Sequence, residues 1–246
     1  MGRILVRPLA AIVIAAALVG ARPAVATDRV DLVLILAVDV SGSVDTERFN
    51  IQRNGYASAF RDPSVIDAIA AGSHGAIAVT FVEWSGPGHQ QQTIGWTLVR
   101  DRPSAAAFAD ALAGVDRVYA DWTSISGAID FAVRLLAGGA PAAERQVIDI
   151  SGDGSNNSGR PVTEARDAAV ALGITINGLP ITTVEPMLDA YYRENVVGGS
   201  GAFTETVSSF DSFAAGVRNK LVKEIVGDPG RSIALAQLRG FEGGQR

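Results

Sequence analysis

The feature that most constrains the fold is a short, uninterrupted apolar run at residues 32–38. The run is rich in Val, Ile and Leu, is too short for a helix, and is bounded by polar residues on both sides. Such a run is typical of a central parallel strand that is covered on both faces. The sequence therefore predicts a sheet with a layer of structure on each side.

Strand-like and helix-like segments alternate along the rest of the chain. Residues 92–99 alternate between polar and apolar side chains, which indicates an edge strand. We predict an α/β fold: one doubly wound, mostly parallel, Rossmann-like sheet with one antiparallel edge strand and helices on both faces. Further strands are predicted at 76–82, 146–150, 174–179 and 202–207, and helices from the turn after residue 43 to about Phe60, where Asp62-Pro63 ends the helix, and at 103–112, 124–136, 161–172, 187–196 and 210–225.

The two ends of the chain differ from this pattern. Residues 1–26 combine early arginines, an apolar stretch at 9–19 and small residues before a cleavage site after Ala26, as in a secretory signal peptide. The apolar stretch is shorter than the roughly 20 residues that span a bilayer, so no stable membrane insertion is expected after cleavage. We predict an exported protein, periplasmic or secreted, with one domain at 27–226 and a Gly-rich tail at 227–246.

Composition excludes several classes of function. The chain has 21 basic and 26 acidic residues without a Lys/Arg cluster, so nucleic acid is not an expected partner. Cysteine is absent, which excludes disulfides, thiolate metal sites and cysteine nucleophiles. The nucleophile elbow, P-loop and dinucleotide motifs are also absent, and neither His74 nor His89 is tied by spacing to a serine nucleophile. The sequence therefore does not predict an enzyme.

Oxygen-bearing side chains follow two of the predicted strands. Asp39, Ser41 and Ser43 form a D-x-S-x-S turn directly after the first strand, and Asp153 follows the strand at 146–150. Thr123, just before a predicted helix, adds a third hydroxyl. Ligands of α/β folds bind at the carboxyl ends of strands, so these side chains are expected to meet there. Carboxylates and hydroxyls without thiol or imidazole favour Mg²⁺, with Mn²⁺ or Ca²⁺ as alternatives, over zinc or copper.

At these five residues the chain resembles the von Willebrand factor type A domain, whose metal-ion-dependent adhesion site is a D-x-S-x-S turn plus a Thr and an Asp from two later loops. The resemblance covers residues 31–225 and is greatest to a group of exported bacterial proteins in that superfamily, for which it implies no specific activity. It implies a divalent cation held at Asp39, Ser41, Ser43, Thr123 and Asp153. It also implies recognition of an unidentified partner protein through an Asp or Glu that completes the metal site.

Five further residues are candidates for the rim of this crevice. Trp122 stands directly before the site threonine, Glu83 and Trp84 end the strand at 76–82, and Asn156 and Asn157 follow the second aspartate. These side chains are expected to contact whatever binds at the metal.

The chain also departs from the usual strand that runs into Thr-Asp-Gly. Asp149 interrupts the strand, and Ser151-Gly152 precedes the site aspartate. We expect a structural role for Asp149 as a hydrogen-bond acceptor from nearby backbone or from Arg145. Three alternatives to a binding module remain open: a helix-capping turn without an ion, a metal-assisted hydrolase of, for example, phosphate esters, and a structural domain with a vestigial metal site.

Overall fold

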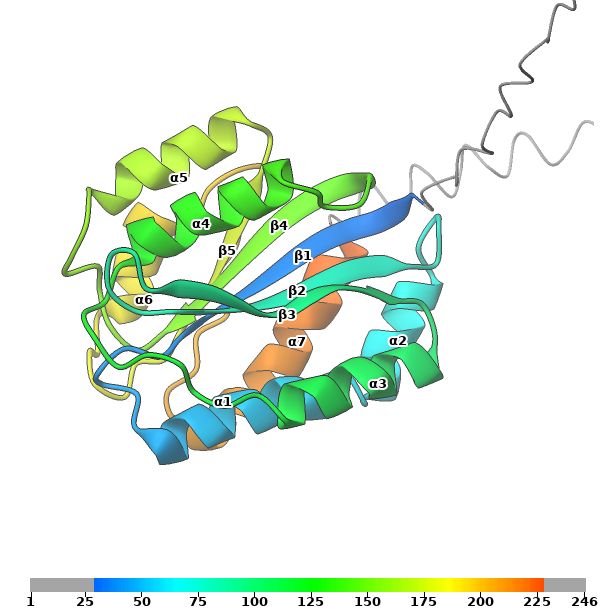
Figure 1. Ribbon diagram of the computed structural model, residues 1–246, viewed down its shortest axis with the longest axis horizontal. Helices are drawn as coiled ribbons and strands as arrows, with labels where there is room; N and C mark the ends of the chain where they lie inside the picture. Colours follow the sequence, from blue (N-terminus) through cyan, green and yellow to red (C-terminus); the bar gives the residue numbers. More distant parts are fainter. Residues whose placement is uncertain (1–28, 228–246) are drawn as a thin grey trace, which may run out of the picture.

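A computed structural model describes residues 29–227, so the predicted signal peptide and all but the first residue of the predicted tail lie outside the described residues. The chain forms one sheet of five strands in the order β3-β2-β1-β4-β5 (Figure 1). All neighbours are parallel except β3, which pairs antiparallel with β2 at one edge. The predicted fold class is confirmed, with strands β1 (Val30–Asp39), β2 (Ile77–Trp84), β3 (Gln90–Val99), β4 (Ala143–Gly152) and β5 (Thr175–Pro180).

Helices cover both faces of this sheet (Figure 1). On one face lie α1 (Thr46–Ala59), α2 (Pro63–Ala70), α3 (Arg102–Ala113) and α7 (Phe213–Val226). On the other face lie α4 (Ile125–Ala137), α5 (Val162–Ala171), α6 (Leu188–Tyr191) and the π-helical turn η1 (Tyr192–Val196). The doubly wound arrangement that the sequence predicts is therefore present.

Two predicted segments differ in detail. Asp62-Pro63 does end α1, but it also begins α2, because the Asp62 carboxylate accepts a bond from Ser64 N (2.9 Å) and proline suits the first helical turn. The predicted helix at 210–225 divides into a 3₁₀ turn, η2 (Phe210–Ser212), followed by α7.

The predicted strand at 202–207 is wrong. This segment makes only isolated bridges, from Thr204 to Gly178 and from Val207 to Ile181. Gly178 N donates to Phe203 O and Val207 N donates to Pro180 O (both 3.1 Å), but Pro180 has no N–H to donate between them, so no regular ladder forms with β5. Before the first bridge, Phe203 N donates to the side-chain Oδ1 of Asn177 (3.1 Å).

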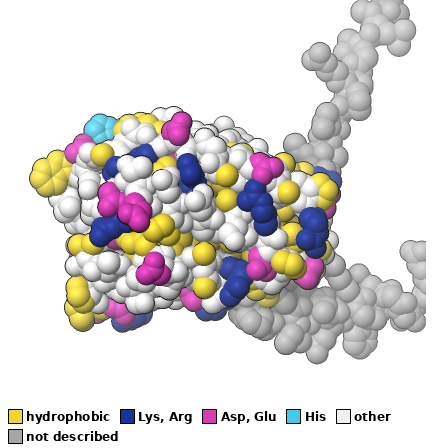
Figure 2. Space-filling model, turned by 90° about the horizontal axis from the view of Figure 1, so that it is seen from below, with side chains coloured by type: hydrophobic (Ala, Val, Ile, Leu, Met, Phe, Trp, Pro, Cys, Tyr) yellow, Lys and Arg dark blue, Asp and Glu magenta, His cyan; other side chains and the backbone are white. Residues whose placement is uncertain are grey.

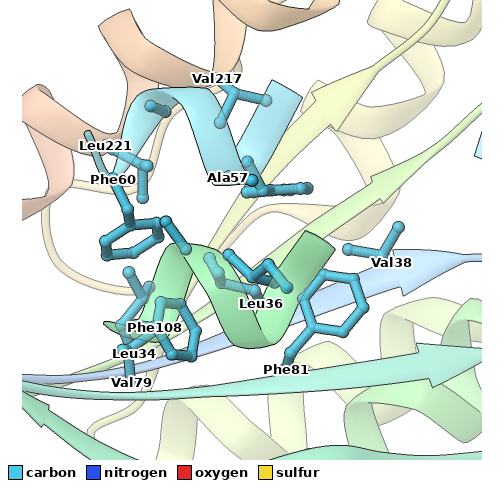
Figure 3. Packing of buried hydrophobic residues seen from close by; sticks show 14 of the residues in the cluster. Leu34, Leu36, Val38, Ala57, Phe60, Val79, Phe81, Phe108, Val217 and Leu221 are labelled. Carbon is cyan, nitrogen blue, oxygen red and sulfur yellow. The ribbon is translucent and has the colours of Figure 1, made fainter. Parts of the chain in front are cut away.

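The core explains why β1 reads as a continuous apolar run. All ten of its residues are buried, because alternate side chains enter the two opposite cores of the domain. Leu34, Leu36 and Val38 point toward α1, α3 and α7, where they pack with Phe60 and Phe108 (Figure 3). Two helix layers thus hold β1 in place, and with it the loop that follows.

The outer surface shows no large patch of one charge on the helical face seen from below, where basic and acidic side chains are interspersed (Figure 2). Within residues 29–227, no helix is both long and apolar enough to cross a membrane.

Candidate functional site

The candidate site lies where the strand order reverses. β1 has β2 on one side and β4 on the other. The chain that leaves β1 continues to α1 on one face of the sheet, whereas the chain that leaves β4 continues to α5 on the other face. Asp39 is the last residue of β1, and Asp153 follows the last residue of β4. The register pairs Val38 with Ser151, which brings these two aspartates to neighbouring positions at the same edge. This is the position at which open α/β sheets bind ligands.

The turn after β1 curls so that its side chains converge. Asp39 Oδ1 accepts a bond from Ser41 N (2.7 Å), and the hydroxyl oxygens of Ser41 and Ser43 are 3.3 Å apart. Ser43 Oγ donates to Asp153 Oδ1 (2.5 Å), which joins the two loops. The cap of α1 is Asp45, whose carboxylate accepts from the helix backbone. The alternative that the D-x-S-x-S turn serves as the helix cap is therefore wrong.

Asn156 and Asn157, in the loop that follows Asp153, hold the segment that carries Thr123. Asn157 N donates to Thr123 O, and Thr123 N donates to Asn157 Oδ1, both at 3.0 Å. Asn156 Oδ1 accepts from Ser126 N (3.1 Å) in the first turn of α4. These bonds fix the threonine beside Asp153, so the structure assigns the asparagines a positioning role in the loop.

The converging side chains open onto a cavity of about 450 Å³. Ser43, Thr123 and Asp153 line it, while Asp39 and Ser41 are buried beside them. Among the predicted rim residues, Trp122 and Asn157 line the cavity.

Glu83 and Trp84 lie elsewhere than the rim. Both side chains belong to the end of β2 and are fully buried. The loop after β5 instead supplies two lining residues that the sequence analysis missed, Val184 and Glu185. No motif marks them, because only the fold brings that loop to the cavity.

Burial shapes the electrostatics of the two aspartates. Burial raises the pKa of Asp39 to about 7, and the neighbouring Asp153 carboxylate adds to the effect. Burial also raises the pKa of Asp153, although Ser43 and Arg48 oppose the shift. Arg48 Nη1 lies 3.4 Å from Asp153 Oδ2, whereas the buried Asp39 Oδ2 has no hydrogen-bond partner within the described residues. The crevice is therefore short of positive charge.

Two further residues brace the loop that carries Thr123. Arg117 Nη2 donates to the carbonyl oxygens of Val40 and Ser41, each at 2.9 Å, and Glu83 Oε2 accepts from Val118 N (2.8 Å). Arg48 and Arg117 were not predicted. Arg48 follows the D-x-S-x-S turn closely enough to be considered from sequence, whereas Arg117 is brought to the turn only by the tertiary structure.

The donor set fits a hard divalent cation. Within residues 29–227 no group of three or more His, Asp or Glu side chains could hold a metal ion, so a site here depends on hydroxyl ligands. Two carboxylates and three hydroxyls converge at the crevice, and one carboxylate oxygen is buried without a partner. Oxygen donors of this kind suit Mg²⁺, Mn²⁺ or Ca²⁺.

Comparison with known families gives one match over most of the chain. The family described as "Protein of unknown function (DUF1194)" matches residues 29–229. No curated protein matches the chain.

Several solved structures share the fold. Proximal thread matrix protein 1 from the mussel byssus has a TM-score of 0.58 at 16% identity, and the match covers 80% of this chain and 47% of the mussel protein. A structure of the same mussel protein has a zinc-occupied MIDAS motif (TM-score 0.57, 13% identity, 80% and 48% covered). A von Willebrand factor type A structure from Catenulispora acidiphila matches with a TM-score of 0.53 at 16% identity, over 80% of this chain and 43% of that chain.

An adhesin is also among the similar structures. The pilus adhesin SpaC from Lactobacillus rhamnosus GG has a TM-score of 0.58 at 14% identity, and the match covers 80% of this chain and 31% of SpaC. The present chain thus spans about half the length of the mussel protein and less of the adhesin. These similarities show a von Willebrand factor type A fold.

Proposed function

The chain belongs to the family described as protein of unknown function (DUF1194), and we propose that it is an exported, metal-dependent protein-binding module. The observation that carries the proposal is the convergence of two aspartates and three hydroxyl side chains on one crevice, with a buried Asp39 oxygen left unpartnered. A buried carboxylate oxygen without a partner is costly, and a cation would offset that cost.

Asp39, Ser41, Ser43, Thr123 and Asp153 would hold the ion, most suitably Mg²⁺. When bound, the ion supplies a Lewis-acidic centre that attracts a further oxygen ligand. Three of the five ligands are neutral hydroxyls and only Asp39 and Asp153 are charged, so the ion can accept one further anionic oxygen ligand in that place. We propose that this group is the Asp or Glu side chain of a partner protein.

The rim of the crevice favours a protein partner over a small anion. Trp122 is 65% exposed and Val184 is 53% exposed, and both line the cavity. Met187, close along the same loop as Val184, is 70% exposed. Large exposed apolar side chains beside a polar centre are typical of protein-binding surfaces. An acidic side chain that reaches the ion would bring its neighbours onto this apolar rim.

Two further observations support the proposal. Proteins of the same fold include a pilus adhesin and a mussel protein with a zinc-occupied MIDAS motif. The signal-like residues 1–26 support export to the periplasm or beyond.

Thermal and denaturant unfolding in EDTA and then in Mg²⁺, Mn²⁺ or Ca²⁺ tests the metal site. A specific ion at about 100 times its dissociation constant should raise the free energy of unfolding by roughly 2.7 kcal/mol. Asp39→Ala and Asp153→Ala should abolish this increase. Asp110→Ala is the matched control, because it removes an exposed aspartate from α3 and should leave the increase intact. An identical metal response in all four proteins would refute the proposed site.

A screen of generic phosphatase and esterase substrates separates binding from catalysis. The proposal expects no metal-dependent turnover by the wild-type protein. Turnover that disappears in Asp39→Ala would instead establish a metal-assisted hydrolase.

A further inference from the structure

A buried tyrosine lies next to the candidate metal site and has no role in the function proposed above. Tyr192 opens the π-helical turn η1, and its side chain is fully buried. Its hydroxyl makes no hydrogen bond within the described part of the chain. Buried hydroxyl groups normally have partners, so an unpartnered one calls for an explanation. π-Helical turns also occur frequently at functional sites.

Two glycines determine where this ring lies. A Cβ atom at Gly178 in β5 would be 2.6 Å from Tyr192 Cδ1, so the ring packs directly on the backbone of that strand. A Cβ atom at Gly152 in β4 would be 2.9 Å from Tyr192 Oη and also 2.9 Å from Asp39 Oδ2. The tyrosine hydroxyl and the unpartnered aspartate oxygen therefore approach the same glycine. A side chain at residue 152 would force them away.

The chemistry of the two oxygens is complementary. Burial, followed by the carboxylates of Asp39 and Asp153, raises the pKa of Tyr192 well above its ordinary value, so the phenol stays protonated and can donate. Asp39 Oδ1 already accepts from Ser41 N, whereas Asp39 Oδ2 lacks a donor. Each carboxylate oxygen has two acceptor lone pairs, so a bond from the tyrosine leaves capacity for an ion.

We propose that Tyr192 is a positioning residue for Asp39: on metal binding its hydroxyl donates a hydrogen bond to Asp39 Oδ2 across Gly152 and orients this oxygen, a bond that is not formed in the described structure. This inference rests on the metal site proposed above. Partners that orient metal ligands in this way typically contribute 10- to 100-fold in metal affinity. The π-helical turn and the two glycines are the features of the fold that bring the phenol to this position.

Metal titration of Tyr192→Phe tests the proposal, because the variant removes only the hydroxyl. We expect Mg²⁺ or Mn²⁺ to bind about 10- to 100-fold more weakly. The melting temperature in EDTA should change little, since the ring keeps its packing. This separation of metal affinity from stability is not expected for a merely structural tyrosine.

Tyr56→Phe is the matched control. Tyr56 is also fully buried, and its hydroxyl donates to Ser151 Oγ (3.3 Å), on the same strand as Gly152. Its removal should leave metal affinity unchanged. Gly152→Ala is the second variant, because its Cβ displaces both oxygens, and it should weaken metal binding as Tyr192→Phe does.

The outcomes are distinct. If wild-type protein binds no metal, the proposed function fails and this inference fails with it. If wild type binds metal and Tyr192→Phe binds it equally well, only the inference fails. Equal loss of affinity in Tyr56→Phe, or a collapse of stability in EDTA that accounts for the loss in Tyr192→Phe, would also overturn it.

Discussion

Two pairs of buried acidic side chains, Asp149 with Glu224 and Asp39 with Asp153, have very different surroundings. Asp149, within β4, contacts Lys220 of α7, with 2.6 Å between Oδ1 and Nζ. Lys220 also contacts Glu224, whose Oε1 accepts from Asn177 Nδ2 (2.9 Å). All three charged side chains of this Lys220 cluster are buried. The protein itself therefore supplies a cation, Lys220, to Asp149 and Glu224.

The acidic group at the crevice has no equivalent. Asp39 and Asp153 are just as buried, but the nearest cation is Arg48, at 3.4 Å from Asp153 and partly exposed. Burying a charge is costly unless it is paired. Lys220 offsets one of the two negative charges of Asp149 and Glu224, although burial and Glu224 still raise the pKa of Asp149 to about 7. The crevice pair has only the partly exposed Arg48 beside it, so it depends more on a proton or a cation from solution.

The largest expected effect comes from removing the internal cation. Lys220→Met leaves the Asp149 and Glu224 carboxylates buried without their ammonium partner. Breaking a buried ion pair from one side typically costs about 3–5 kcal/mol. Denaturant unfolding should show this loss with or without Mg²⁺. Lys223→Met, on an exposed residue of the same helix, is the control and should cost far less. Similar costs for both variants would contradict the comparison.

Removing the charge of Asp39 should have the opposite effect: without metal, it should raise the free energy of unfolding. Because the folded pKa of Asp39 is raised to about 7, the folded protein holds this proton more tightly than the unfolded chain does. The stabilising contribution of protonated Asp39 to the free energy of unfolding is fully present below about pH 4 and is lost as the pH rises through about 7. Asp39→Asn removes the loss, so in EDTA it should be more stable than wild type at pH 8 by roughly 2–4 kcal/mol.

Unfolding of both proteins from pH 4 to 8, in EDTA and in Mg²⁺, measures this difference. The stabilities should converge toward pH 4. In Mg²⁺ the order should reverse, since only wild type retains the aspartate ligand. A pH-independent difference in EDTA would show that Asp39 is not the group that titrates.

The smallest effect is expected at Arg48. Its guanidinium is partly exposed, so its pairing with Asp153 contributes up to about 1 kcal/mol. Arg48→Gln removes a positive charge that competes with a metal ion, and we expect Mg²⁺ to bind two- to fivefold more tightly, in line with such an energy. Arg61→Gln removes the same charge just beyond the C-terminal end of α1 and should leave Mg²⁺ affinity unchanged. Weaker Mg²⁺ binding by Arg48→Gln would indicate that the arginine helps to form the site.

Local patterns in the sequence carry information about the elements and about the spacing of the site. The apolar run before Asp39 predicts a strand with both faces covered, and β1 is buried at every residue. Prediction succeeds there because strand pairing and burial depend on the periodicity of neighbouring side chains. It fails at residues 202–207, because the neighbouring strand carries Pro180, which has no N–H to donate to this segment.

Asp149 also shows a feature that local pattern predicts and one that it does not. The sequence predicts a structural role for Asp149, but its partner is Lys220 and not Arg145. Arg145 donates instead to the carbonyl oxygens of Glu224 and Ile225 at the end of α7. No local pattern identifies which of two basic residues, one nearby in sequence and one 71 positions away, reaches a buried carboxylate.

The α/β class, the alternation of strands and helices, and the order of the oxygen-bearing residues can all be read from the sequence alone, because they follow from local periodicity and from motifs at strand ends. Which charges meet, in contrast, follows from the three-dimensional fold. The fold places Lys220 against Asp149 and Tyr192 over Gly152 beside Asp39, and it gives the crevice carboxylates only the partly exposed Arg48. The physical reason is that burial and pairing arise from contacts between segments far apart in the chain.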